Sequence, residues 1–313
     1  MKDNRRKRAA FLVLLMMLLF LCSCSAQPSQ GICYRITGGR NSMVILGSIH
    51  VGNKQMEPYG EHILHEMQQA DVFVFECDNE DPAALQAAQD LMFLESGTLA
   101  DVLLPECYGL VSRVCRQENF AMTVMDQMKP WAVSSVLTTD AAAGQLGVRN
   151  AQKAMEYGVE NTVLRYAEGK ELCYLETAEQ QLLLMDGMSM PLQQEMLWQT
   201  CTTILDPQAA KNSTLSSWPK WWHDGDAEAF ARDYALEDDA MDPLLAEEYH
   251  SALVTGRNRQ MADGLCDLLE NEESHRYFVT VGLMHLVLPR DSILWELEQR
   301  GYTVERLWLE ENP

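Results

Sequence analysis

Basic residues are scarce in this chain. From position 24 onward, 19 lysines and arginines stand against 45 aspartates and glutamates, a net charge of −26. Nucleic acids and anionic lipid surfaces attract basic proteins, so this deficit argues against both as direct partners. The acidic balance is typical of a well-solvated surface, and it is not in itself evidence for a metal site.

Paired cysteine spacings are lacking as well. No CxxC or CxH pattern occurs, so nothing indicates a zinc knuckle. Seven cysteines follow Cys24, and this odd number leaves at least one free thiol unless one pairs between molecules. Cys107 and Cys115 are close enough in sequence to pair, whereas Cys77 and Cys173 lie in apolar runs typical of small core residues. The seven are Cys33, Cys77, Cys107, Cys115, Cys173, Cys201 and Cys266.

No apolar run is long enough to cross a bilayer comfortably. Residues 9–21 form an apolar run that follows a basic start and ends in small residues, as signal peptides do. The run closes on Leu21-Cys22-Ser23-Cys24, which resembles a bacterial lipobox with Cys24 as the lipid-bearing residue. An uncleaved anchor is the alternative, and both interpretations place the body of the protein outside the membrane; the lipoprotein interpretation predicts an extracytoplasmic protein. The prediction is a signal peptide at 1–23, a lipid-anchored tether at 24–30 and a folded domain at 31–313.

The apolar pattern predicts an α/β fold. Continuous apolar runs, typical of strands buried on both faces, end at Leu46, Phe75, Leu175 and Val281. A hairpin strand at 33–37 precedes the first run, and a last strand is expected at 303–309. Helices are expected near 58–70, 82–95, 106–119, 130–142, 159–168, 177–206, 226–270 and 292–300, with a Trp/Pro-rich stretch separating helices at 217–226. We therefore predict a central, mainly parallel sheet covered by helices, with a long helical insert between the N- and C-terminal strands.

Polar residues follow each of the four buried runs. Gly47-Ser-Ile-His50 follows the first, Glu76 the second, Glu176 the third and Gly282-Leu-Met-His285 the fourth. Ligands of open α/β sheets gather at the carboxyl ends of the strands, where such loops converge. Two histidines and a carboxylate are a common ligand set for a divalent metal. The repeated form, an apolar strand followed by Gly-x-x-His, hints at two related half-sites.

The motifs resemble those of a known family. GSIHVG with VFVFECD, then GVENTVLRYAEGKELCYLETAEQQ, RNRQMADGL and FVTVGLMHLVLP are similar in order and spacing to the TraB/GumN family. That family includes the Tiki proteins, described as metal-dependent proteases. The resemblance runs from about Cys33 to Leu309. Two departures are Ser48, where threonine is frequent, and the missing glycine after the second histidine's His-Leu, which puts the substrate in doubt.

The resemblance assigns roles to individual residues. His50 and His285 match the two metal-binding histidines, and Glu76 matches the acidic residue after the second strand. Glu176 and Gln180 match the family's LET…Q block. The RN pair corresponds to Arg257 and Asn258.

These matches imply a metal-dependent, peptidase-like hydrolase acting on an extracellular peptide or a related amide or ester. His50, His285 and Glu76 would hold Mn²⁺, Co²⁺ or Zn²⁺, which would activate a water molecule. Glu76 is alternatively the general base, with Glu176 as the remaining carboxylate. Arg257 would stabilise a developing oxyanion, and Asn258 would donate to it.

Two other functions fit the same residues. Part of the family is linked to sequestering or blocking peptide pheromones, so a non-catalytic protein that binds a peptide or small molecule is the main alternative. Haem or metal-ion capture would also use two histidines, but it would tolerate the loss of Glu76 and Arg257. The cluster Trp218, Trp221 and Trp222 is either a peptide groove or a packed elbow between helices. The substrate and the oligomeric state stay open.

Overall fold

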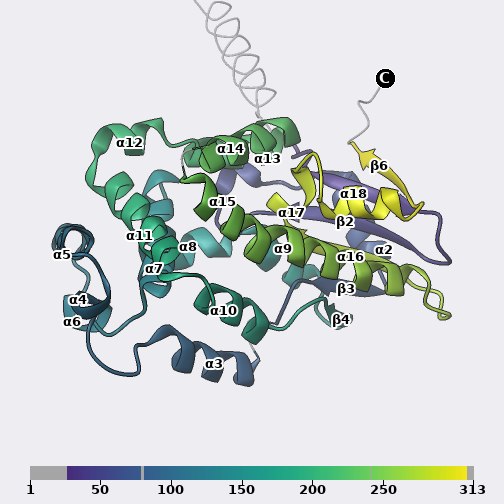
Figure 1. Cartoon of the computed structure of the whole chain (residues 1–313). Helices are drawn as coiled ribbons and strands as arrows, with labels where there is room; N and C mark the ends of the chain where they lie inside the picture. The colour runs from purple at the N-terminus through teal and green to yellow at the C-terminus, as the bar shows by residue number, and fades with distance from the viewer. Residues whose placement is uncertain (1–26, 79–80, 240, 309–313) are drawn as a thin grey trace, which may run out of the picture.

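The chain is described by a computed structural model over residues 27–78, 81–239 and 241–308 (Figure 1). The predicted signal peptide and residues 24–26 of the tether, Cys24 included, lie outside these described residues. Within the described ranges, no helix combines the length and the apolar character needed to span a membrane.

Six strands form one mixed sheet in the order β4-β3-β5-β2-β1-β6. The pairs β4–β3, β3–β5 and β5–β2 are parallel, whereas β1 is antiparallel to both β2 and β6. The predicted mainly parallel sheet and its N-terminal hairpin are therefore confirmed. The strands are β1 (Cys33–Thr37), β2 (Ser42–Ser48), β3 (Val72–Phe75), β4 (Glu171–Tyr174), β5 (Arg276–Gly282) and β6 (Thr303–Leu307).

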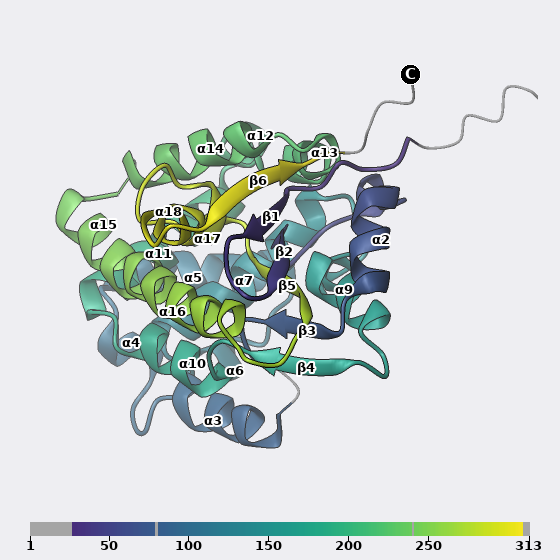
Figure 2. The same cartoon turned by 90° about the vertical axis from the view of Figure 1, so that its right-hand side faces the viewer.

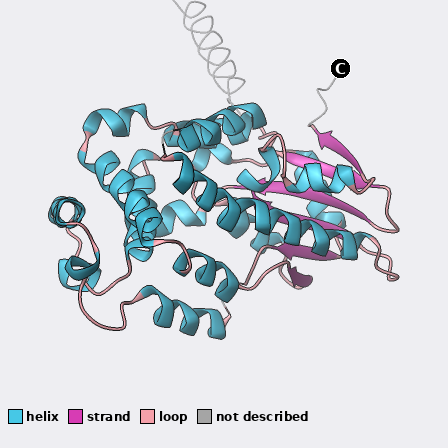
Figure 3. Cartoon of the chain, in the orientation of Figure 1, coloured by secondary structure: helices cyan, strands magenta, loops and turns pink. Residues whose placement is uncertain are grey.

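Helices make up most of the remaining described chain (Figure 3). Those up to β4 are η1 (Lys54–Met56), α2 (Glu61–Gln69), α3 (Pro82–Met92), α4 (Leu99–Val102), α5 (Pro105–Glu118), α6 (Met122–Met125), α7 (Pro130–Gln145), α8 (Ala151–Glu156) and α9 (Val159–Tyr166). Those after it are α10 (Ala178–Asp186), α11 (Met190–Leu205), α12 (Pro207–Asn212), η2 (Leu215–Ser217), α13 (Trp218–Asp224), α14 (Ala227–Asp239), α15 (Pro243–His250), η3 (Ser251–Thr255), α16 (Gly256–Leu269), α17 (Met284–Val287) and α18 (Ile293–Gln299).

Both faces of the sheet are covered, as the continuous apolar runs predict. Successive side chains of a strand point to opposite faces, so Phe73 and Phe278 pack with α2, α9 and α13, whereas Val74 and Val279 pack with α16 and α18. Figure 2 shows α2 and α9 on one side of the strands and α16 and α18 on the other. A third core, around Trp131 and other buried residues, holds the helical insert together.

The insert differs from the prediction in two places. The expected helix 177–206 is interrupted at Gly187 and Met188, between α10 and α11. The Trp/Pro-rich stretch is itself helical as α13, because Pro219 lies in the first turn, where its missing N–H removes no helical hydrogen bond. Trp222 of this helix is fully buried, so it belongs to a packed element.

The strand β4 also departs from the expected central position. It lies at the edge of the sheet, and its side chains are mostly exposed, including Leu172 and Tyr174. The apolar run that ends at Leu175 therefore lies next to the run that ends at Phe75, in one sheet with the other two, as predicted. It is not covered on both faces.

The suggested pairing of Cys107 with Cys115 is wrong. Both residues lie on α5 eight positions apart, which is about 12 Å along the axis, and disulfide-linked Cα atoms are usually within about 7 Å. Cys33, Cys107, Cys115, Cys173, Cys201 and Cys266 are free thiols.

Candidate functional site

The carboxyl ends of four neighbouring strands carry the candidate residues. Glu76 follows β3, and Glu176 lies two positions beyond β4, where its backbone N–H donates to the Glu76 carbonyl over 2.7 Å. Gly282 ends β5, and Ser48 ends β2 directly opposite it in the parallel register. The sheet order therefore places these residues along one edge, which confirms the neighbouring strands on which the sequence prediction depended.

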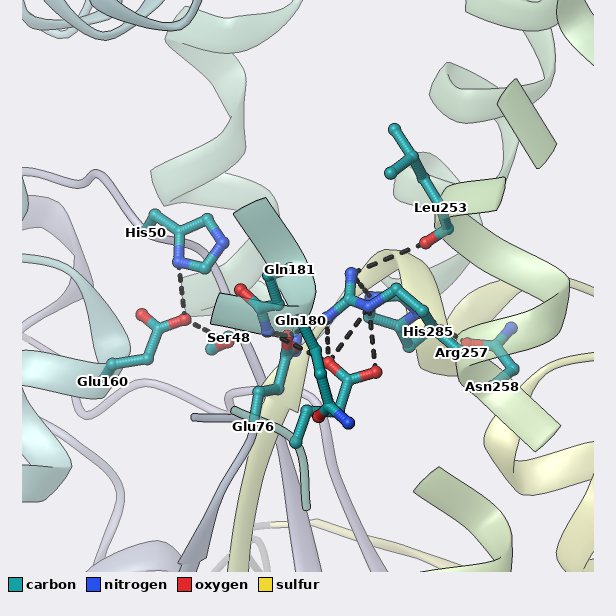
Figure 4. A network of polar contacts seen from close by, with 12 residues as sticks. Ser48, His50, Glu76, Glu160, Gln180, Gln181, Leu253, Arg257, Asn258 and His285 are labelled. Carbon is teal, nitrogen blue, oxygen red and sulfur yellow. Dashed lines mark hydrogen bonds and ion pairs between the residues drawn. The ribbon is translucent and has the colours of Figure 1, made fainter. Parts of the chain in front are cut away.

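Arg257 lies at the centre of this edge, as Figure 4 shows. Its Nη2 donates to Glu76 Oε2 over 2.6 Å and to Glu176 Oε2 over 2.8 Å, and its Nε contacts both Glu176 oxygens over 3.1 Å. The residue follows η3, a π-helical turn between α15 and α16, which changes the phase of the long helix just before Arg257. Such charge-assisted, two-pronged contacts are the strongest hydrogen bonds that an arginine makes.

The cluster is shielded from water. The exposed fraction is 12% for the Arg257 side chain, 14% for Glu76 and 3% for Glu176. Burial acts to raise the pKa of Glu76, but the charges of His285, Arg257 and His50 lower it to about 2. Glu76 is therefore ionised at neutral pH, and Arg257 is its buried counter-ion.

His285 completes the cluster from α17. Its Nδ1 lies 2.5 Å from Asn258 Oδ1, and Asn258 Nδ2 donates to the Asp291 carbonyl over 2.7 Å. This orientation of the amide makes Nδ1 the protonated nitrogen, so the lone pair on Nε2 accepts from Arg257 Nη1 over 3.2 Å. Burial lowers the pKa of His285 to about 4, and the ring is neutral at pH 7.

Both motif glycines lie in close packing. A side chain at Gly282 would place its Cβ 3.1 Å from Glu76 Oε1, the oxygen that accepts the Gly282 N–H. A Cβ at Gly47 would lie 2.4 Å from a methyl carbon of Leu283, at the start of α17. Glycine at these positions therefore lets β5 hold Glu76 and lets α17 approach β2.

His50 has different surroundings from His285. Its side chain is 79% exposed, and its Nδ1 lies 2.8 Å from Glu160 Oε1, which also accepts from the Ser48 hydroxyl over 2.6 Å. The attraction of Glu160 raises the pKa of His50, and the water around this exposed ring limits the effect. Figure 4 shows His50 and Glu160 beside the Arg257 cluster, on the same edge.

Glu160→Gln is expected to lower the pKa of His50 towards its usual value of about 6.5, because the neutral amide removes the attraction for the imidazolium. Since the folded-state pKa is raised, the stabilisation by this pair is fully present below about pH 6.5 and is lost as the pH rises through the folded value. Histidine NMR titrations in chelator-containing buffer measure the shift. His65→Ala identifies the NMR signal of His65, an exposed histidine that serves as the control. A titration of His50 that is unchanged in Glu160→Gln would contradict the contact between His50 and Glu160.

The predicted metal set suits a divalent ion in its chemistry but not in its arrangement. Each histidine has Nδ1 held by a protein oxygen, as in many metal sites. However, Arg257 already engages Glu76 and the Nε2 of His285, so two of the three expected ligands have another partner. Among the described residues, no group of three or more His, Cys, Asp or Glu side chains is placed to hold a metal ion.

The contacts of three polar residues at the site were not predicted from the sequence. Gln181, not Gln180, reaches the cluster, and its Nε2 donates to Glu76 over 3.2 Å and to Glu176 over 3.1 Å. Gln180 instead forms a capping box with Thr177, a role that the Thr-x-x-Gln pattern before a helix indicates. Glu160 and Ser48 both lie within the family motifs, but nothing in the sequence indicates that Glu160 contacts both the Ser48 hydroxyl and His50.

Asn258 is placed differently from its expected role. Its amide contacts His285 and donates one N–H to Asp291, and the residue is fully buried. Asn258 therefore orients the imidazole of His285.

The fold and the site define an α/β protein with a buried arginine–carboxylate–histidine cluster at the carboxyl edge of a mixed sheet. The chain belongs to the TraB/PrgY/gumN family, whose model matches residues 32–306. No curated protein and no solved structure matches it.

Proposed function

We propose that this chain is an exported hydrolase that acts on a peptide, or a related amide or ester, outside the cytoplasm. The observation that carries the proposal is the exposed His50, oriented by Glu160, beside the buried cluster of Arg257 and His285. A histidine held by a carboxylate is a common general base, and a fixed guanidinium is a common partner for developing negative charge.

In the proposed reaction, His50 takes a proton from water while the water oxygen bonds to the substrate carbonyl carbon. The carbonyl oxygen becomes an oxyanion, and Arg257, whose guanidinium is fixed by Glu176, is the candidate positive charge beside it. The bond to the leaving nitrogen or oxygen then breaks, and His50 returns the proton to it. Asn258 acts as a positioning residue through His285.

A divalent metal is a separate part of this proposal. His50, His285 and Glu76 stay the candidate ligands for Mn²⁺, Co²⁺ or Zn²⁺, which would lower the pKa of a bound water molecule. Because Arg257 engages Glu76 and His285, the proposed reaction uses side chains alone.

The decisive experiment is cleavage of a peptide library by the purified chain, with and without chelator and added Mn²⁺, Co²⁺ or Zn²⁺. His50→Ala is expected to lower kcat/KM by roughly 10²–10⁴-fold, the usual contribution of a general base. His65→Ala, a change of the same type at an exposed position of α2, should leave cleavage unchanged. If neither amides nor esters are hydrolysed by the wild type under any metal condition, the hydrolase proposal fails.

Anchoring by lipid is the second part of the proposal. Cys24→Ala is expected to release the chain from membranes or to leave an unprocessed precursor, because the lipid acceptor is lost. Cys22→Ala is the matched control, since a small residue fits that lipobox position. A Cys24→Ala protein that still fractionates with membranes as a shortened, lipid-modified species would contradict the anchor.

A non-catalytic binding function is supported by one cavity. The cavity has a volume of about 760 Å³, within the usual range of ligand pockets, and lies among α7, α11, α14, α15 and α17. Met284, the neighbour of His285, lines it. A binding protein would retain peptide affinity in His50→Ala and show no cleavage to lose, which distinguishes the two functions.

A further inference from the structure

The cavity bounded by α7, α11, α14, α15 and α17 has a buried carboxylate in its wall. Asp233 of α14 lines this cavity of about 760 Å³, and only 5% of the residue is exposed. Its Oδ1 accepts from the Thr214 hydroxyl over 2.6 Å, and its Oδ2 accepts from Trp218 Nε1 over 2.7 Å. The carboxylate is therefore fixed in place by two neutral donors.

Asp233 lacks the counter-ion that the other buried carboxylates have. In the part of the chain that the structure describes, three acidic residues are buried. Glu176 pairs with Arg257 over 2.8 Å, and Glu296 pairs with Arg300 over 3.3 Å. Asp233 has only its two neutral donors, and no lysine or arginine among the described residues lines the cavity. Because a buried charge without a partner is costly, this carboxylate is suited to a cation that comes from outside the chain.

The rest of the cavity wall favours a ligand that donates hydrogen bonds. Apart from the carboxylate and the imidazole of His250, the described wall has no charged side chain, and Trp218 and Met284 contribute apolar surface. Gln145 also lines the cavity, and its side-chain oxygen is buried without a hydrogen-bond partner among the described residues. A carboxylate and an amide oxygen are both acceptors, so the wall calls for N–H donors.

We infer that this cavity binds an organic amine, whose ammonium group donates to Asp233 while its apolar body occupies the cavity. Each Asp233 oxygen accepts one hydrogen bond from the protein and has a second lone pair for a ligand. His50 and Arg257 do not line the cavity, so this site is separate from the proposed hydrolysis. It gives a ligand class to the binding function that the cavity supports.

The test is a titration of the purified chain with hexylamine, followed through the NMR signal of the Trp218 indole N–H, which donates to Asp233. Trp218→Phe identifies this signal. Hexylamine is protonated at neutral pH, as lysine is, whereas 1-hexanol is neutral and hexanoate is negatively charged. Hexylamine is expected to bind at least about tenfold more tightly than either, because only the ammonium group forms a charge-assisted hydrogen bond with the carboxylate.

Asp233→Asn keeps the size of the side chain and removes its charge. The affinity for hexylamine should fall at least about tenfold, while the affinity for 1-hexanol stays nearly unchanged. Glu228→Gln is the matched control, because Glu228 lies on the same helix with 91% of its side chain exposed. This variant should bind hexylamine as the wild type does.

A second variant tests the same charge with Asp233 in place, and it keeps the test decisive if Asp233→Asn folds poorly. Leu236 lies three positions further along α14, lines the cavity and is 65% exposed. Leu236→Lys therefore puts an ammonium group within reach of the carboxylate, since residues three apart are neighbours on a helix. It should weaken hexylamine binding by internal competition, whereas the neutral Leu236→Gln should not.

Two further probes distinguish the sources of an amine. Leu-Leu-amide carries a free amino terminus, and its N-acetyl form does not. Preferential binding of the free form would identify a peptide amino terminus as the ligand group. Hexylamine binding without binding of Leu-Leu-amide would identify a small amine.

Equal affinities for hexylamine, 1-hexanol and hexanoate would overturn the inference. Unchanged hexylamine affinity in both Asp233→Asn and Leu236→Lys would overturn it as well. Either result would leave the hydrolase proposal standing, because that proposal is tested by cleavage and by His50→Ala. Conversely, selective hexylamine binding without any wild-type cleavage would support the amine site while the hydrolase proposal fails.

Discussion

Replacing Arg257 with methionine is expected to lower the free energy of unfolding by about 3–5 kcal/mol in chelator-containing buffer. The reason is that Glu76 and Glu176 would stay close together, with 14% and 3% of their side chains exposed, without a counter-ion. Urea denaturation followed by circular dichroism measures the loss. Arg259→Met should change the value by no more than about 0.5 kcal/mol, as surface substitutions usually do.

The pH dependence gives a further check on the same variant. The pKa of Glu76 is lowered to about 2 in the folded wild type, so its contribution to stability is present above the unfolded value of about 4.3 and is lost as the pH falls through the folded one. The difference in the free energy of unfolding between wild type and Arg257→Met should therefore become smaller below about pH 4. Adding Glu176→Gln to Arg257→Met should recover part of the loss at neutral pH, and no recovery would contradict a charge effect.

Trp222→Ala is expected to lower the free energy of unfolding by about 3–5 kcal/mol, the usual cost of deleting a buried tryptophan. The side chain is fully buried, its ring centroid lies 4.9 Å from that of Tyr59, and its Nε1 donates to the Gly47 carbonyl over 2.8 Å. Because Gly47 lies at the end of β2, just before the loop that carries His50, the change should also loosen the site. Urea denaturation measures the first effect, and the His50 NMR signal reports the second.

Two variants refine this experiment. Trp222→Phe keeps most of the ring but leaves the Gly47 carbonyl without its donor, so its cost should be smaller, about 1–3 kcal/mol. Trp198→Ala removes the same side chain at a position where 39% of it is exposed, and its cost should be clearly smaller than that of Trp222→Ala. Equal losses at Trp198 and Trp222 would argue against a structural role for α13.

The sheet could be predicted from sequence because its signal is local. Runs such as Met43–Leu46 and Val72–Phe75 are apolar at successive positions, a pattern typical of strands covered on both faces. The exposed edge position of β4 was missed for the same reason, since a short apolar run does not reveal whether a neighbour covers it. The interruption at Gly187 and the helical form of α13 depended likewise on packing around them.

The histidine motifs show where sequence reasoning stopped. Gly-x-x-His occurs twice, and the two motifs begin in the last two residues of neighbouring parallel strands, as the repeated pattern suggested. The chain then enters α17 after Gly282, which buries His285, whereas it continues into a loop after Ser48, which leaves His50 exposed. The motif spacing is equal in the two cases, and the different burial comes from the elements packed against each loop.

The sequence by itself determined which strands form, which polar residues follow them, and that these residues share one edge of the sheet. Only the tertiary structure decided which atoms meet: Arg257 enters the cluster 181 positions after Glu76, and Glu160 reaches His50 from α9. The physical reason is that a strand is selected by its own apolar residues, whereas an ion pair depends on the packing of elements far apart in the chain. The spacing of residues in the sequence does not indicate that the Arg257 guanidinium lies between the Glu76 and Glu176 carboxylates.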